Sequence, residues 1–386
     1  MDESEKPLLG SDASAASKEE DVDDPRVVIP KRTVIIEPLL IAFIFFALPS
    51  SSASSQYILS SIRSDLGVNF TTNSTPCGEN VTDDDPEKLL EAQAQSQAAY
   101  FSLYLDLLQG VPAAIIGIFL GNYSDKAGRK YAIVPPCIGL TIKCLSYVLV
   151  ISLKANIYFL FIGTFLDGCC GSFTTLLCGS LAYVTDIISV EKRTFRITVV
   201  EMCMLLPSVV SAVGTGYLIR ATGYLPPFII MLIGVFLTTA YAIFFIPETI
   251  KKDPEAKLFS TDHLKEAFLI YFKDDGTGRS LCLILLLCSL VGPLLVSFST
   301  GIDTLFQMNY PLCWTSVTIG IYSSTVLAMV AGGGLICAYF LRKCLSDAGM
   351  ILLSGISSAL NSGYKSIVRN TPMMFMSKSF YINCLS

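Results

Sequence analysis

Five ionisable side chains lie inside long apolar stretches of the sequence. They are four carboxylates and one amine: Asp106, Asp167, Glu201, Asp303 and Lys143. An ionisable group inside a membrane helix costs about 2.5–3.5 kcal/mol on insertion scales, so its presence indicates a function. A buried carboxyl can take up a proton and neutralise its site, and a nearby amine can pair with it. We therefore expect proton coupling or solute binding at these positions.

Each of these residues also has a simpler interpretation. Asp167 and Glu201 could be buried carboxyls that bond to neighbouring hydroxyls. Lys143 could extend its amine to the membrane surface instead of pairing. Asp106 and Asp303 lie in the outer halves of their apolar stretches, where water could solvate them.

A second group of charges lies in the segment 121–130, GNYSDKAGRK, between two apolar stretches. Its glycines and charged residues are Gly121, Asp125, Lys126, Gly128, Arg129 and Lys130. The three basic residues place the connection on the cytoplasmic side of a membrane. The two glycines predict a tight, close-packed turn, and the acidic and basic residues can bridge helix ends there.

Composition defines the class of protein. The chain has 386 residues, of which 52% are hydrophobic and 15% charged, whereas soluble domains carry about 25% charged residues. The sequence therefore predicts a polytopic membrane protein. It has no basic patch with interleaved aromatic residues for nucleic acid. Its 13 cysteines form no Cys-x-x-Cys pair and His263 is its one histidine, so we expect no metal site. No nucleophile–base–orienter set and no phosphate-binding loop occur, so we expect no enzyme activity and no cofactor.

Apolar runs of membrane-spanning length predict eight helices, and a short ninth run is ambiguous. The eight cover residues 33–60, 96–120, 131–153, 156–185, 197–218, 224–246, 280–306 and 315–340, and the short run covers 349–360. We expect a disordered cytoplasmic tail at 1–32, a six-helix bundle at 33–246, a cytoplasmic loop at 247–279 and an incomplete helical half at 280–386. The polar loop 63–95 carries glycosylation sequons at Asn69, Asn73 and Asn80, which places it outside.

The segment Gly121–Lys130 resembles the signature loop between the second and third helices of the major facilitator superfamily of transporters. The resemblance implies an all-α fold with two six-helix halves, here a complete N-terminal half and an incomplete C-terminal half. It also implies a charge network that holds the cytoplasmic gate shut. Its members here would be Asp125, Arg129, Asp186 and Arg193.

Shorter motifs narrow the resemblance. PLCW at 311–314 and RTFR at 193–196, just before Glu201, are similar to the solute carrier 46 family, which includes the proton-coupled folate transporter. The resemblance implies proton-coupled movement of a small organic anion such as folate, with Glu201 and Asp167 as coupling candidates. It also implies a disulfide between Cys77 and Cys313 on the outer side.

Two other hypotheses stay open. The tail motif EKPLLG at 5–10 resembles an acidic dileucine sorting signal, which favours a lysosomal exporter of small peptide or glycopeptide fragments over a plasma-membrane carrier. The incomplete second half favours a truncated, non-transporting isoform. In every case the expected partners are the lipid bilayer, a small-molecule substrate and protons, with the N-terminus in the cytoplasm; the oligomeric state is open.

Overall fold

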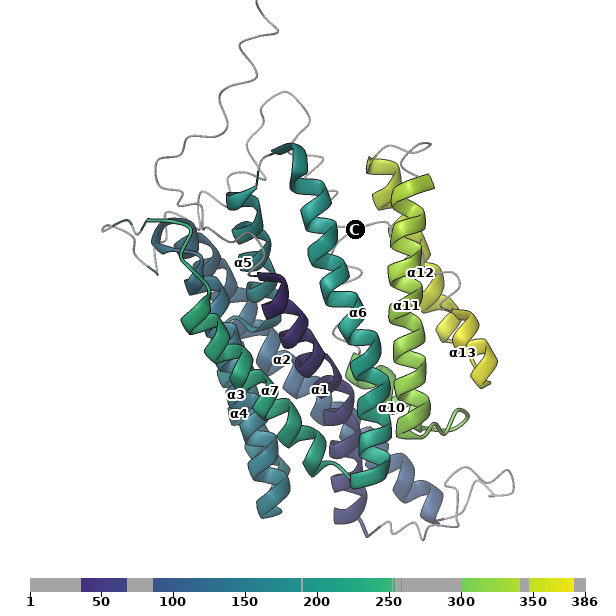
Figure 1. Cartoon of the computed structure of the whole chain (residues 1–386). Helices are drawn as coiled ribbons and strands as arrows, with labels where there is room; N and C mark the ends of the chain where they lie inside the picture. Colours follow the sequence, from purple (N-terminus) through teal and green to yellow (C-terminus); the bar gives the residue numbers. More distant parts are fainter. Residues whose placement is uncertain are drawn as a thin grey trace, which may run out of the picture.

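The computed structural model describes residues 36–67, 86–188, 190–251, 253, 258, 300–340 and 347–377, and these residues form a helical bundle (Figure 1). The first part contains α1 (Ile36–Asp65), α2 (Pro86–Ala127), α3 (Lys130–Leu153), the 3-10 helix η1 (Ile157–Phe159), α4 (Leu160–Cys169), α5 (Ser172–Ile187), α6 (Val190–Thr222) and α7 (Leu225–Phe245). The second part contains α10 (Thr300–Met308), α11 (Ser316–Phe340), α12 (Asp347–Lys365) and α13 (Thr371–Ser377).

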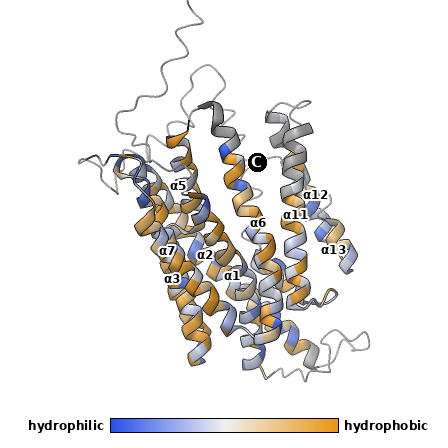
Figure 2. Cartoon of the chain, in the orientation of Figure 1, coloured by the Kyte–Doolittle hydropathy of each residue, from blue (hydrophilic) through white to orange (hydrophobic). Residues whose placement is uncertain are grey.

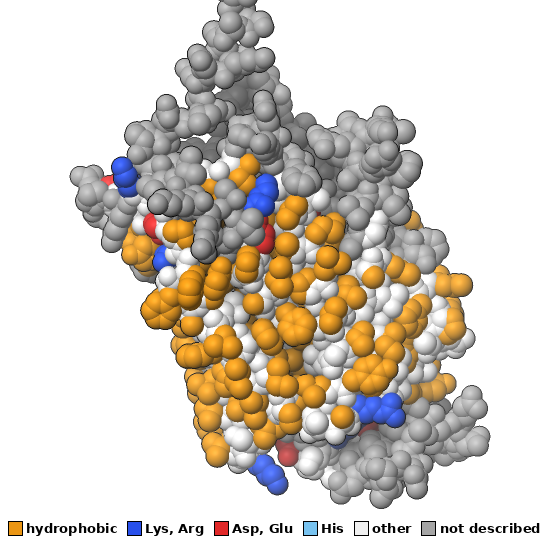
Figure 3. Space-filling view, in the orientation of Figure 1, with side chains coloured by type: hydrophobic (Ala, Val, Ile, Leu, Met, Phe, Trp, Pro, Cys, Tyr) orange, Lys and Arg blue, Asp and Glu red, His pale blue; other side chains and the backbone are white. Residues whose placement is uncertain are grey.

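Six helical segments of the described chain are long and apolar enough to cross a membrane. They match the first six predicted spans and confirm an all-α polytopic membrane protein. Apolar residues run along the outward faces of α3 and α7 (Figure 2). In Figure 3 the charged side chains gather toward the two ends of the visible face, and a hydrophobic band lies between them. This distribution fits a bilayer around the middle of the bundle.

The connection between the first two helices is shorter than the sequence suggests. Helix α1 continues to Asp65 and α2 begins at Pro86, so helix occupies both ends of the segment expected as a polar loop. The guanidinium of Arg63 pairs with the carboxylate of Glu91, and Nε lies 3.0 Å from each carboxylate oxygen. This ion pair joins the two helix ends and explains why polar residues there remain helical.

The fourth predicted span is broken. The structure replaces one helix over 156–185 by η1, α4 and α5, with the break at Cys170 and Gly171. Gly171 has φ +92°, which glycine adopts without strain. One turn earlier, Gly168 packs against α2 so closely that a Cβ would lie 2.5 Å from the carbonyl oxygen of Gln109. The break therefore lets α4 approach α2 and places Asp167 at that contact.

The core of the bundle is formed by α1, α3 and α7 with parts of their neighbours. Leu39, Leu59, Ile133 and Phe228 have no exposed surface. The ring of Tyr147 on α3 stacks on Phe228 of α7 with centroids 4.7 Å apart. This packing fixes α3, which carries one wall of the polar site described below.

Helix α11 runs alongside α6 and joins the second part of the chain to the first (Figure 1). The approach is close because both helices present glycine. A Cβ on Gly216 would lie 2.6 Å from the carbonyl oxygen of Ser316, and one on Gly320 would lie 2.6 Å from that of Ala212. Ser324 Oγ also donates to the carbonyl of Val209 at 2.6 Å. We call this contact the α6–α11 seam.

The second part is only partly described. The predicted span 280–306 is described from residue 300, where α10 begins, and the ambiguous run 349–360 lies within the longer helix α12. The PLCW motif anchors α11 to α13: Trp314 Nε1 donates to Thr371 Oγ1 at 2.9 Å and its ring contacts Phe375. The predicted tail 1–32 and most of the predicted loop 247–279 lie outside the described residues.

Candidate functional site

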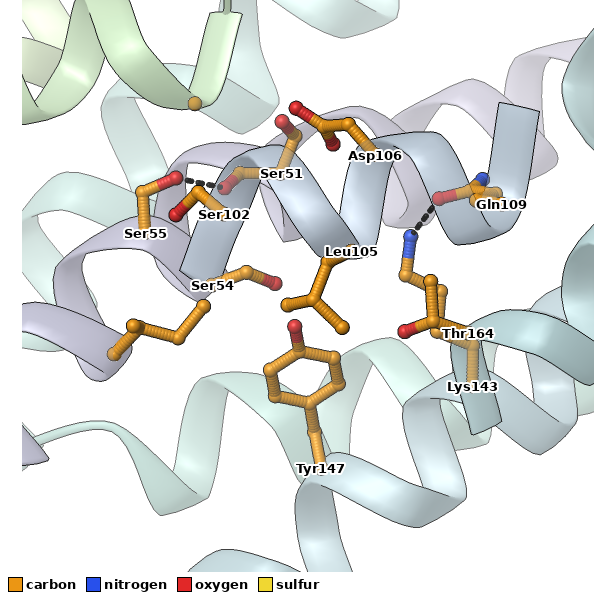
Figure 4. Close-up of a pocket in the computed structure, with 12 residues that line it drawn as sticks. Ser51, Ser54, Ser55, Ser102, Leu105, Asp106, Gln109, Lys143, Tyr147 and Thr164 are labelled. Carbon is orange, nitrogen blue, oxygen red and sulfur yellow. Dashed lines mark hydrogen bonds between the residues drawn. The ribbon is translucent and has the colours of Figure 1, made fainter. Parts of the chain in front are cut away.

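A polar cavity lies between α1, α2, α3 and α4, with α10 on one side (Figure 4). Its lining is Ser51, Ser54, Ser55, Ile58, Ser102, Leu105, Asp106, Gln109, Lys143, Tyr147, Thr164 and Gly301. The cavity measures about 30 Å³. That is room for about two water molecules, so the cavity is small.

Gln109 connects two of the predicted residues. Its Oε1 accepts from Lys143 Nζ at 2.8 Å, and its Nε2 donates to Asp167 Oδ2 and Ser172 Oγ, each at 2.8 Å (Figure 4 shows the lysine contact). The amide thereby uses its oxygen and both N–H bonds, which fixes its orientation. We call Lys143, Gln109 and Asp167 the amide bridge.

The amide bridge holds opposite charges close together in the membrane. Asp167 is 2% exposed, and its Oδ2 lies 4.0 Å from Lys143 Nζ. The sequence suggested that Lys143 neutralises one of the carboxylates, and the structure places it next to Asp167. Gln109 was missed because it is uncharged. Its one signal in the sequence is that it is a polar residue at helical spacing from Asp106 on α2.

Two hydroxyls of the cavity already use their hydrogens within their own helix. Ser54 Oγ donates to the carbonyl of Ser50 at 2.6 Å, and Ser55 Oγ donates to that of Ser51 at 3.3 Å. These hydroxyls therefore present lone pairs to the cavity, as acceptors. The ring of Tyr147 lines the same part of the cavity.

Asp106 lies close to Gly301 of α10. A Cβ on Gly301 would lie 3.8 Å from its Oδ2 and 3.1 Å from Ser55 Oγ. Within the described part of the chain its carboxylate makes no hydrogen bond or ion pair. Asp106 is half-buried and lines the cavity, where the charge of Lys143 acts on it.

The other two predicted carboxylates lie elsewhere. Glu201 is on α6, outside the cavity lining, and its Oε2 is buried without a hydrogen-bond partner among the described residues. Asp303 on α10 forms an ion pair with Lys365 of α12. Asp303 therefore has a partner that the sequence did not suggest, and only Asp106, Lys143 and Asp167 come together.

At the other end of the bundle, Arg129 forms ion pairs with two carboxylates. Its Nε and Nη2 donate to the two oxygens of Asp186 at 2.7 and 3.1 Å, and its Nη1 pairs with Asp125. Burial would lower the pKa of Arg129, but Asp186 and Asp125 outweigh it and raise the pKa above its ordinary value. The predicted network of Asp125, Arg129 and Asp186 therefore lies in one place, whereas the side chain of Arg193 lies outside the described residues.

Glu248, just after α7, binds the backbone at the start of α3. Its Oε1 accepts from the backbone N–H of Arg129 at 2.6 Å, and its Oε2 accepts from that of Lys130 at 3.3 Å. A carboxylate at the first turn of α3 satisfies N–H groups that have no partner within the helix. Sequence reasoning missed Glu248 because its partners are backbone groups about 120 residues away.

The two glycines of the predicted turn have different surroundings. Gly128 has φ +128°, and a Cβ there would lie 2.4 Å from Glu248 Oε2. Gly121 is inside α2, and a Cβ there would meet nothing within 4 Å. The expectation of a close-packed turn thus holds at Gly128 but is wrong for Gly121, because α2 continues as helix to Ala127.

Several predicted features remain predictions. Asn69, Asn73, Asn80 and Cys77 lie outside the described residues. Cys313 is disulfide-bonded, and its partner is not among the described residues, so the pairing with Cys77 is untested.

Three comparisons with known proteins bear on the fold and the site. A model of the Major Facilitator Superfamily matches residues 39–374. A Gallus gallus protein, lysosomal proton-coupled steroid conjugate and bile acid symporter SLC46A3, is 27% identical over 90% of this chain and 76% of its own. The Rattus norvegicus proton-coupled folate transporter is 28% identical over 88% of this chain and 73% of its own.

A solved structure supports the arrangement of the helices. The crystal structure of a D-xylose-proton symporter superposes with a TM-score of 0.53 at 12% identity, and covers 91% of this chain and 79% of its own. At that identity the likeness concerns the fold alone.

Proposed function

The chain belongs to the Major Facilitator Superfamily, and we propose that it moves a small organic solute with an anionic group across a membrane together with protons, through the cavity beside Lys143. It is a secondary transporter with relatives that are proton-coupled symporters. The observation that carries the proposal is the amide bridge. It places an amine and a buried carboxylate in contact at the wall of a polar cavity.

The amide bridge suggests how proton and solute are coupled. With Asp167 ionised, its charge and that of Lys143 balance each other at 4.0 Å. A proton on Asp167 removes the negative charge next to Lys143, so the amine is no longer paired within the amide bridge. An anionic group of the solute can then pair with Lys143, so proton and anion favour each other's binding.

The cytoplasmic network suggests how one face is closed. Arg129, Asp125, Asp186 and Glu248 tie α2, α3, α5 and the end of α7 together without help from α10–α13. In this proposal the N-terminal bundle, residues 33–246, moves as a unit, and the segment 247–279 connects it to the C-terminal helices from residue 280 onward. Glu201 stays a second candidate for coupling, supported by the unpartnered oxygen on α6.

We place the N-terminus in the cytoplasm and favour the lysosomal membrane over the plasma membrane. The basic residues Lys126, Arg129 and Lys130 lie at the end of the bundle that this orientation turns inward. The tail motif EKPLLG and the lysosomal name of one relative support the choice of membrane.

The test is uptake into proteoliposomes that contain the purified full chain, with and without an inward proton gradient. Labelled folate is the first tracer, because a relative is named for it. We expect uptake to rise with the gradient in the wild type. Lys143→Gln should lose most of the uptake, since the anion loses its partner, and Asp167→Asn should keep some uptake but lose its dependence on the gradient.

The control is Asp65→Asn, which removes a carboxylate from the exposed outer end of α1. Proton-stimulated uptake by Asp167→Asn at the wild-type level would contradict the coupling role. Unchanged uptake by Lys143→Gln would contradict the anion site.

A further inference from the structure

The cavity has two chemically different ends. At one end Lys143 uses one N–H on Gln109 and retains others for a ligand. Elsewhere in the lining, the carboxylate of Asp106 makes no hydrogen bond or ion pair among the described residues, although the charge of Lys143 acts on it. It lies near Ser55, whose hydrogen is bonded to its own helix. One end therefore donates hydrogen bonds and carries a positive charge, while the other accepts them and carries a negative charge.

The charges of the site are unequal. Among the described residues in and next to the cavity, Asp106 and Asp167 are acidic and Lys143 is basic, so the ionised site has a net charge of −1. One proton on Asp167 makes it neutral. Binding of a zwitterion leaves the net charge of the site at zero. Binding of an anion returns the net charge to −1, and a second proton, on Asp106, is then needed to neutralise the site. In low dielectric, an unbalanced charge is costly.

Two buried hydroxyls point to a ligand at the same place. Ser102 is 4% exposed and Thr164 is 1% exposed, and neither hydroxyl has a hydrogen-bond partner among the described residues. Both line the cavity. Buried hydroxyls are normally bonded, so these two lack a partner that a polar ligand can supply.

We infer that the solute is a zwitterion, with its anionic group on Lys143 and its ammonium group on Asp106. This inference rests on the proposed function and narrows its substrate class to amino acids and small peptides with a free amino terminus. Asp106 then sets specificity and takes no part in the proton cycle. The cavity has room for about two water molecules, so binding of such a solute requires its lining to move apart.

The test compares two probes that differ in one charge. They are a dipeptide with uncharged side chains and the same dipeptide acetylated on its amino terminus. Binding to the purified full chain is measured by the shift of the thermal unfolding midpoint over a concentration series, and uptake is measured in proteoliposomes. We expect the wild type to bind the free dipeptide about tenfold more tightly than the acetylated form, because an ionised hydrogen bond is lost.

Asp106→Asn should bring the ratio of the two affinities close to one, and Asp65→Asn should leave it unchanged. Equal binding of both probes by the wild type would overturn the inference without any variant. A preserved ratio in Asp106→Asn would also overturn it. If folate is transported but the free dipeptide neither binds nor is transported, the inference is wrong and the proposed function stands; if no probe is transported, the proposed function is wrong as well.

Discussion

At the scale of single residues, Gln109 is the group on which the site depends most. Among the residues that the structure describes, it is the one side chain that bonds to Lys143, Asp167 and Ser172 together. We expect Gln109→Leu to leave a buried amine and a buried carboxylate without their shared partner. The loss of stability should be about 1–3 kcal/mol, and coupled uptake should fall with it.

Gln97→Leu is the matched control, because Gln97 is an exposed glutamine on the same helix. Thermal unfolding of the purified protein in detergent and uptake in proteoliposomes measure both variants. If Gln109→Leu behaves like Gln97→Leu in both measurements, the amide bridge has no energetic role.

The sequence identified the charged members of the site but not their grouping. A charge inside an apolar run stands out because its insertion is costly, and this argument found Asp106, Lys143 and Asp167. It also found Asp303, whose partner Lys365 comes from a helix that the sequence predicted only weakly. The sequence did not predict Gln109 and Ser172 as site residues, because neutral polar residues are common in membrane helices. Only the tertiary contacts show their hydrogen-bond partners.

At the scale of elements, Gly121 and Gly128 belong to one sequence motif but have different surroundings. Gly121 lies inside α2, and Gly128 lies in the turn between α2 and α3. Gly128→Ala adds a Cβ 2.4 Å from Glu248 Oε2 at φ +128°. We expect it to destabilise the protein by about 1–3 kcal/mol and to weaken the contact between Glu248 and α3. Gly121→Ala, in open space inside α2, should be tolerated.

The comparison needs the unfolding midpoint of the two alanine variants and the wild type under the same conditions. Equal midpoints for the two variants would show that the close approach of Glu248 to Gly128 does not constrain the turn.

The sequence predicted the positions of the first six membrane-length helical segments correctly, but it did not predict where helices end or break. The first six predicted spans correspond to membrane-length helical segments because apolar length is a local property. The extension of α1 to Asp65 and of α2 back to Pro86 depends on the ion pair of Arg63 and Glu91. The break at Gly171 depends on the fit of Gly168 against α2, and no local pattern encodes either contact.

At the scale of the whole molecule, the α6–α11 seam is the contact along which the second part of the chain meets the bundle. Its small residues bring two helix backbones together, as is common in membrane proteins that lack a hydrophobic force between helices. A transporter of this superfamily works by movement of one half against the other, so a seam of this kind must hold the halves together while they move.

Gly216→Val tests the seam, and Gly214→Val is its control. The added Cβ at Gly216 lies 2.6 Å from the carbonyl of Ser316, so α11 must move away from α6, whereas a Cβ at Gly214 meets nothing within 4 Å. Both variants carry the same change in helix propensity on the same helix, so their difference isolates the contact. We expect Gly216→Val to lose most of its uptake and to lower the unfolding midpoint, while Gly214→Val stays close to the wild type. Similar uptake by the two variants would mean that the halves are held together elsewhere, for example by the contacts of α10 with α1 and α2.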